Sequence, residues 1–354
     1  MYHEEIKNYI KEWITKNWSL YYNINKIDVT IEKISIKEAK VDCIAQVSIN
    51  KVLKAKSVGE LPYIKGILKK INIADYERKL ANELKVEKVF NANKSSLNNN
   101  EIRKMVKLLD DKYLELEEYI GKAYDSYIIL KFEAGLVENI IEDKTIKLYV
   151  EQMNGFISAN ELIPKVPQEY EDMGSKEIVS ALNVVKTEVE ISQNLYVGYD
   201  RLKARDYAIT WTSNASSYCP HGIALQNTSK WNNTKWPYQS SLCHNDCADF
   251  VSQSLNAGGI PIDPGKWERF NDGNNNWAWT YVPGLKNYML NQKSYWKLST
   301  WENASAGGVI VIPNSHVMMI VKNDTIERLY SAHTNDRLNY PYAKNTSWEY
   351  YVLW

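Results

Sequence analysis

NDCADFVSQSLNAGG, residues 245–259, is the stretch that most directly predicts the fold of this chain. Phe250, Val251 and Leu255 follow Cys247 by three, four and eight residues, so they share one face of a helix. The two glycines that end the stretch are typical of a helix C-terminus. The sequence therefore predicts a buried helix with Cys247 in its first turn.

A cysteine in the first turn of a helix is a candidate nucleophile. The positive end of the helix dipole lowers the pKa of a thiol, and the thiolate is the reactive form. His316 opens the later apolar run HVMMIV, so a strand could hold its imidazole across a cleft from Cys247 as the base. His333 follows after enough chain for a strand, a turn and a return strand, so it is the candidate for orienting His316. Asn335 and Asp336 are the reserve candidates for that role.

The rest of this half predicts a sheet that follows the helix. GGVIVIP (307–313) and HVMMIV (316–321) are short apolar strands, and RLYSAHTNDR (328–337) begins a third. Further upstream, Asp200 is a good N-cap for a helix over the residues that follow it. A helix packed on an antiparallel sheet is the expected arrangement.

These blocks resemble the bacterial putative amidase domain, which is related to CHAP-type and other papain-like cell-wall hydrolases. The resemblance runs from Tyr199 to about Tyr340. It implies a papain-like fold and hydrolysis of an amide bond through an acyl-enzyme, with no cofactor and no metal. Cys247 would attack, His316 would move the proton, and His333 would orient it. Peptide or peptidoglycan-like substrates follow from the same resemblance, as does a cell-wall or extracellular role.

The resemblance also suggests supporting residues and shows two departures. The oxyanion would be held by the Cys247 N–H together with Asn245 or Gln239, and Asp246 lies beside the thiol. Members of the family usually carry Gly-Asp where this chain has Gly307-Gly308. The loop from 216 to 242 is also longer than the usual approach to the cysteine, which affects the expected shape of the substrate cleft.

The composition changes near residue 190 and predicts two units. Charged side chains concentrate before this point, whereas most of the 12 tryptophans follow it. We expect an α+β accessory domain over 1–163, a linker over 164–190 that contains Pro164 and Pro167, and the papain-like domain over 191–354. The whole chain is thus predicted to be α+β.

The first unit mixes helices and strands without a catalytic constellation. Its last stretch, VEQMNGFISANEL, resembles the closing hairpin of cystatin-like domains. The periodicity predicts helices over Glu4–Trp18, Leu61–Leu84 and Glu101–Ile120, and strands over Ile27–Ile36, Ala39–Ile49, Tyr127–Phe132 and Lys144–Val150.

Charge and hydropathy exclude some classes of partner. Lys+Arg and Asp+Glu both number 43, so there is no basic footprint for a nucleic acid. No apolar run approaches the roughly 20 residues that span a bilayer, so we expect no membrane insertion. The N-terminal residues lack the apolar core of a secretory signal, which conflicts with a cell-wall role and leaves the location open.

The other cysteines allow three interpretations. Cys219, His221, Cys243 and His244 could together bind zinc, although their spacing is not a common finger pattern. A disulfide between the two cysteines is an equal alternative if the protein is exported. Two free thiols are favoured over both.

The aromatic residues leave a competing function open. The run WAWTYVPGL (277–285), with Trp267 and Trp296, could line a groove for a sugar or peptide, but packing in the core is favoured. A catalytically silent papain-like module that binds peptide or glycan is therefore the alternative to a cysteine hydrolase.

Overall fold

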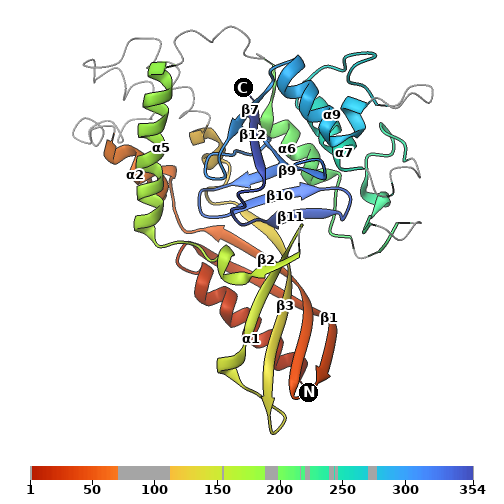
Figure 1. The fold of residues 1–354 in the computed structure, drawn as a ribbon. Coiled ribbons are helices and arrows are strands. Elements are labelled where there is room, and N and C mark those ends of the chain that lie inside the picture. Colours follow the sequence, from red (N-terminus) through yellow and green to blue (C-terminus); the bar gives the residue numbers. More distant parts are fainter. Residues whose placement is uncertain are drawn as a thin grey trace.

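The computed structural model describes residues 2–70, 112–153, 155–187, 198–215, 217–219, 224–238, 243, 246–269 and 277–353. Helices and antiparallel sheets occur in both halves of the chain (Figure 1), so the predicted α+β class is confirmed.

The N-terminal part packs a long helix against an antiparallel sheet. Its helices are α1 (Tyr2–Trp18), η1 (Val58–Glu60), α2 (Pro62–Lys70), η3 (Asp143–Thr145), η4 (Ala159–Leu162) and α5 (Pro167–Thr187). Its strands are β1 (Tyr22–Lys37), β2 (Lys40–Leu53), β3 (Ala123–Val137), β4 (Ile140–Ile141), β5 (Lys147–Gln152) and β6 (Gly155–Ser158). The strands pair in the order β1-β2-β3-β5-β6, with β4 beside β3.

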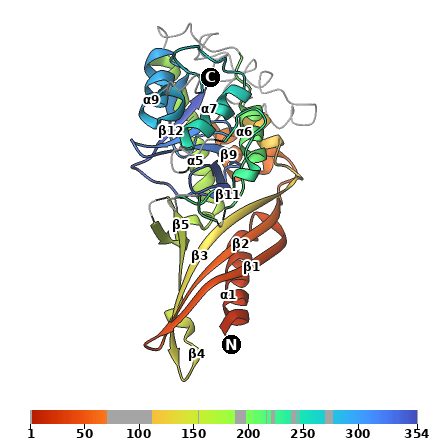
Figure 2. The same ribbon diagram turned by 90° about the vertical axis from the view of Figure 1, so that its right-hand side faces the viewer.

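Helix α1 forms because its apolar residues recur every four positions. Ile6, Ile10 and Ile14 are completely buried and face the sheet, whereas charged residues occupy the opposite side. Each buried isoleucine contributes roughly 1.5–3 kcal/mol. Figure 2 shows the long strands β1, β2 and β3 extending away from the C-terminal part, with α1 alongside them.

The C-terminal part places several helices against a second antiparallel sheet. Its helices are α6 (Arg201–Thr210), η5 (Thr228–Lys230), α7 (Cys247–Ala257), α8 (Trp277–Thr280), α9 (Val282–Asn287) and the π-helical turn η7 (Tyr288–Gln292). Its strands are β7 (Trp296–Ser299), β8 (Val309–Ile312), β9 (His316–Asn323), β10 (Arg328–Ala332), β11 (Arg337–Pro341) and β12 (Glu349–Leu353). The sheet order is β11-β10-β9-β8-β12-β7.

Alternating residues of this sheet enter two different cores. Val309 and Val311 pack with α7, whereas Ile310 and Ile312 pack with an aromatic cluster on the other face. The predicted helix and its strands are confirmed, since α7 begins at Cys247 and ends where Gly258 caps it. The predicted N-cap of α6 is confirmed as well, because the Asp200 carboxylate accepts from the Lys203 N–H at 3.0 Å.

Gly308, where the resemblance led us to expect aspartate, has no room for a side chain. A Cβ at this position would lie 2.6 Å from the Tyr351 carbonyl oxygen on β12. Any side chain would therefore push β12 away from β8, with which it pairs.

Buried polar contacts join the two parts of the chain. Lys51 on β2 pairs with Glu327 at 2.6 Å, and Lys322 at the end of β9 pairs with Asp324. Tyr22 on β1 donates to the same Asp324 carboxylate at 2.9 Å. The charges of these two lysines and two acids balance, so the contact between β9 and the first sheet is electrically neutral.

Much of the predicted linker is helical. Helix α5 occupies 167–187 and packs against α2, where a Cβ on Gly174 would come within 2.0 Å of the Tyr63 carbonyl oxygen. The domain boundaries themselves stay a prediction. Within the described part of the chain, none of the helices combines the length and apolarity needed to cross a bilayer.

Candidate active site

Cys247 is the first residue of α7 and lies against the beginning of β9. The backbone N–H groups of Val317, the residue after His316, and of Ala248 and Cys247 in the first turn act on the sulfur and lower the thiol pKa. The side chain is 6% exposed. Burial raises the pKa of the thiol to about 12, and the N–H donors oppose that shift.

His316 is the first residue of β9 and is 5% exposed. Its Nε2 atom has no hydrogen-bond partner among the described residues. Burial lowers the pKa of the imidazole to about 4. The described contacts include no hydrogen bond between this ring and the Cys247 sulfur; the main chain of Val317 links the two residues.

His333 lies just after β10 with both ring nitrogens engaged. Nδ1 contacts Oδ2 of Asp246, and Nε2 lies 2.8 Å from the carbonyl oxygen of Trp211. The ring is stacked between Trp231 and Phe250, with centroid distances of 4.3 and 4.0 Å. None of these contacts reaches His316, so the orienting role expected for His333 stays a prediction.

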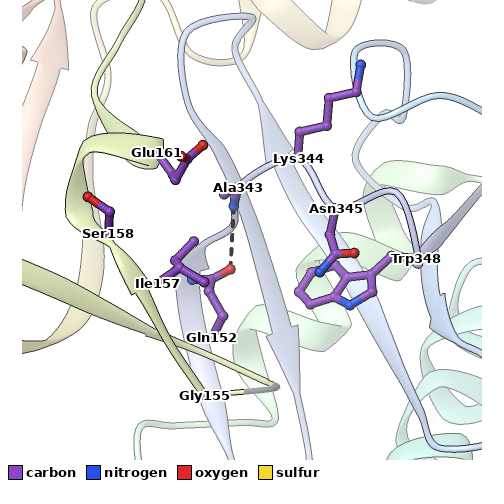
Figure 3. A pocket seen from close by; sticks show the side chains of 9 residues that line it. All are labelled: Gln152, Gly155, Ile157, Ser158, Glu161, Ala343, Lys344, Asn345 and Trp348. Atoms are coloured by element: carbon purple, nitrogen blue, oxygen red, sulfur yellow. Dashed lines mark hydrogen bonds between the residues drawn. The ribbon is translucent and has the colours of Figure 1, made fainter.

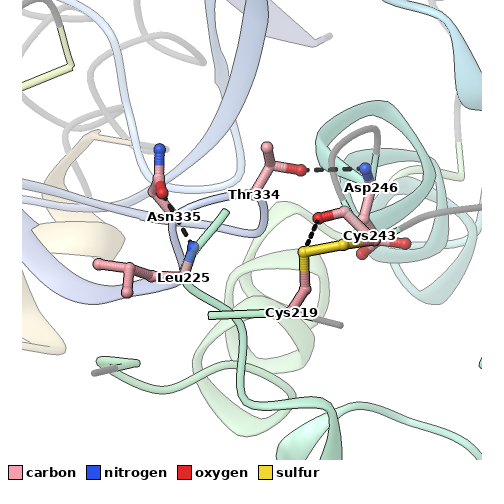
Figure 4. Close-up of a disulfide and its surroundings, with 6 residues drawn as sticks. All are labelled: Cys219, Leu225, Cys243, Asp246, Thr334 and Asn335. Atoms are coloured by element: carbon pink, nitrogen blue, oxygen red, sulfur yellow. Dashed lines mark hydrogen bonds between the residues drawn. A yellow bond between two sulfur atoms is a disulfide. The ribbon is translucent and has the colours of Figure 1, made fainter. Parts of the chain in front are cut away.

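Asp246 is a fully buried neighbour of the thiol. Its N–H donates to the Thr334 hydroxyl at 3.0 Å (Figure 4), which ties the start of α7 to the loop after β10. Burial raises the pKa of its carboxyl, and the charges of Asp249 and Asp336 add to the shift. Asp249 itself is paired with Arg269 at 2.8 Å.

Asn335 and Asp336 hold the loop that precedes α7. The Asn335 side chain accepts from the Leu225 N–H at 3.0 Å (Figure 4), and Asp336 accepts from the N–H of Asn227 and from the Trp231 indole, both at 2.9 Å. Gln239 and Asn245, the candidates for the oxyanion hole, lie outside the described residues.

Cys219 and Cys243 form a disulfide with their Cα atoms 5.5 Å apart. The prediction of two free thiols is therefore wrong, because the fold brings together two cysteines whose spacing carries no disulfide signature. Sulfurs joined to each other cannot serve as zinc ligands. Within the described residues no group of His, Cys, Asp or Glu is arranged for a metal, and His221 and His244 fall outside them.

The tryptophans near α7 belong to the core. Trp267 and Trp279 are completely buried and Trp296 is 4% exposed, which confirms the packing interpretation for these residues. Trp277, by contrast, is 65% exposed.

A cavity of about 270 Å³ lies elsewhere, between β5–β6 and the loop before β12. Figure 3 shows Gln152, Lys344 and Trp348 around it, and no predicted site residue lines it.

The sequence drew attention to Cys247, His316 and His333 but not to the residues that surround His333 and Asp246. Trp211, Trp231 and Thr334 contact His333 or Asp246 from segments far apart in the chain. The one available signal for these contacts was a loop rich in Trp and Asn. Such a composition does not predict which tryptophan contacts which histidine.

Comparison with known proteins gives one match, over the C-terminal part of the chain. No curated protein matches the chain, and no solved structure does. Residues 198–354 match the family model described as a putative amidase domain, so the resemblance predicted for the C-terminal part of the chain is confirmed.

Proposed function

We propose that the C-terminal part is a papain-like cysteine hydrolase that cleaves an amide bond, with Cys247 as nucleophile and His316 as base. One observation carries the proposal: Cys247 at the start of α7 shares a core with Val317, the residue after His316 at the start of β9. The Val317 N–H lies near enough to the sulfur to lower the thiol pKa. The family match supports amide hydrolysis in general terms. The cysteine mechanism rests on the placement of these residues.

The unsatisfied imidazole nitrogen of His316 supports its assignment as the base. Among the described residues, Nε2 of this ring has no hydrogen-bond partner. A general base needs a nitrogen that is free to accept a proton, and Nε2 meets that requirement.

The proposed reaction has two steps. The sulfur attacks the carbonyl carbon, a C–S bond forms, and the C–N bond breaks as the thiol proton passes through His316 to the leaving amine. Water then attacks the thioester, the C–S bond breaks to release the acid, and a proton from that water passes through His316 to the sulfur. First-turn N–H groups of α7 are suitable donors for the oxyanion.

Burial sets the resting charge of the pair. With the Cys247 pKa raised to about 12 and the His316 pKa lowered to about 4, both groups are neutral at pH 7. The thiol therefore loses its proton during attack and not beforehand. Approach of the substrate carbonyl is what makes the transfer favourable.

We propose a peptide or peptidoglycan-like substrate, with the accessory N-terminal α+β domain helping to capture or place it. The Cys219–Cys243 disulfide supports an oxidising, extracytoplasmic setting, where such substrates occur. Neither a cofactor nor a metal takes part in the proposed steps.

The direct test replaces Cys247 by Ser. We expect loss of all turnover on purified peptidoglycan and on a panel of acyl-peptides, read by mass spectrometry, and loss of labelling by a thiol-directed acyl probe. Cys43→Ser, at a buried position of β2 in the other core, is the matched control and should keep both. Undiminished turnover in Cys247→Ser defeats the proposal.

The alternative is a silent module with the same fold that binds peptide or glycan. The observation in its favour is the neutral resting state of the thiol and imidazole. Iodoacetamide at neutral pH separates the two functions. Burial raises the pKa of both thiols, but in an enzyme His316 can take the Cys247 proton during attack on the reagent, so Cys247 should alkylate well before Cys43. Equally slow labelling of both favours the silent module.

A further inference from the structure

Asp246 occupies the N-cap position of α7 without capping the helix. An aspartate at this position ordinarily accepts hydrogen bonds from the N–H groups of the first turn, but the Asp246 side chain makes no such bond. Its carboxyl instead contacts Nδ1 of His333. The N–H groups of Cys247 and Ala248 act on the Cys247 sulfur.

The geometry of His333 fixes the proton count of this contact. A carbonyl oxygen can only accept, so Nε2, at 2.8 Å from the Trp211 carbonyl, must carry hydrogen. The contact of Nδ1 with Oδ2 then contains a single shared proton, on the ring or on the carboxyl. In either form the pair is neutral overall and the carboxyl is held firmly.

We propose that His333 is a positioning residue that holds the Asp246 carboxyl away from the amino end of α7, so that the first-turn N–H groups serve Cys247. The inference rests on the proposed function and gives His333 a role that does not require contact with His316. Stacking between Trp231 and Phe250 fixes the plane of the His333 ring. The hydrogen bond from the Asp246 N–H to the Thr334 hydroxyl fixes the backbone at Asp246.

Charges around the pair explain why this restraint matters. Asp249 on α7 and Asp336 after β10 both face Asp246, and Arg269 is the cation on that side. Because the Asp246–His333 pair is neutral overall, the negative charge beside Asp246 comes from Asp249 and Asp336, and Arg269 offsets part of it. A released Asp246 carboxylate could turn to the helix end, take its N–H groups and repel a thiolate.

The test is the rate of Cys247 alkylation by iodoacetamide at pH 8, read by peptide mass mapping, with Cys43 as internal reference. His333→Phe keeps the stacking but cannot hold the carboxyl. We expect Cys247 to react about tenfold more slowly, as for a rise of about one pKa unit, and turnover to fall at unchanged KM. Asp246→Asn carries no charge and should not slow alkylation, and adding it to His333→Phe should restore most of the rate.

His333→Phe alone should therefore slow alkylation, and adding Asp246→Asn should reverse that loss, which a merely structural role would not produce. An unchanged alkylation rate in folded His333→Phe overturns the proposal, as does slowing by Asp246→Asn. Should His333→Phe lack the native circular dichroism spectrum, Asp246→Asn alone decides: an equal or faster rate supports the proposal and a slower rate overturns it. Alkylation needs no substrate, so absence of turnover in the unmodified protein would count against the proposed function and not against this inference.

Discussion

The beginning of β9 and the loop after β10 each present a buried histidine, but the two rings have opposite surroundings. His316 has an Nε2 atom without a partner among the described residues, and burial alone shifts its pKa. His333 has both nitrogens engaged and aromatic rings on both faces. A ring with a free nitrogen can exchange a proton with a substrate, whereas a fully bonded ring can hold its neighbours in place.

We propose different parts for the two histidines. His316 acts as the base, and His333 positions Asp246, the residue before Cys247. Each assignment makes a different prediction, because loss of a base removes rate while loss of a support changes stability and geometry.

The largest expected effect comes from His316→Gln. Removing a general base lowers turnover by roughly 10² to 10⁴-fold, and the glutamine should keep the fold because the position needs no charged partner. Steady-state kinetics on the substrate found for the unmodified protein measures the loss. His3→Gln, on the exposed side of α1, is the matched control and should be unaffected. Equal activity of the two variants would remove His316 from the mechanism.

The second largest effect concerns the stability given by the disulfide-closed loop whose Trp231 stacks on His333. Replacing Cys219 and Cys243 together by Ala opens the closed loop that carries Trp231, which stacks on His333. Chain-entropy reasoning gives a loss of about 3.5 kcal/mol in the free energy of unfolding. Urea unfolding measures it, and reductant should destabilise the unmodified protein by a similar amount while leaving the variant unchanged. A reductant-insensitive unmodified protein would contradict the disulfide.

The smallest effect is the pH dependence contributed by His316. The pKa of His316 falls from 6.5 in the unfolded chain to about 4 in the fold. The contribution of the neutral, buried imidazole to the free energy of unfolding is therefore complete above pH 6.5 and is lost as the pH falls towards 4. The stability advantage of the unmodified protein over His316→Gln should shrink by about 3 kcal/mol between pH 7 and pH 4. Taking this difference cancels the opposite slope from the raised carboxyl of Asp246. If the two proteins differ in free energy of unfolding by the same amount at pH 7 and at pH 4, then His316 is not buried in its neutral form.

Much of the fold could be predicted because it depends on local patterns. The spacing of Phe250, Val251 and Leu255 requires a helix with one buried face, and the glycines after Ala257 end it. The short apolar runs of β8 and β9 are equally local signals. The contacts of His333 could not be predicted, because Trp211, Trp231 and Asp246 reach it from three separate segments.

The sequence by itself determined that Cys247 lies in the first turn of a helix and that His316 opens a strand. Both follow from periodicity, which depends only on residues that are close in the sequence. The tertiary structure alone decided which groups contact the two ring nitrogens of His333, that Cys219 pairs with Cys243, and that Gly308 must lack a side chain beside Tyr351. These outcomes depend on distances between segments that are remote in the chain. No local pattern encodes such distances, because they follow from how the helices and the sheet pack together.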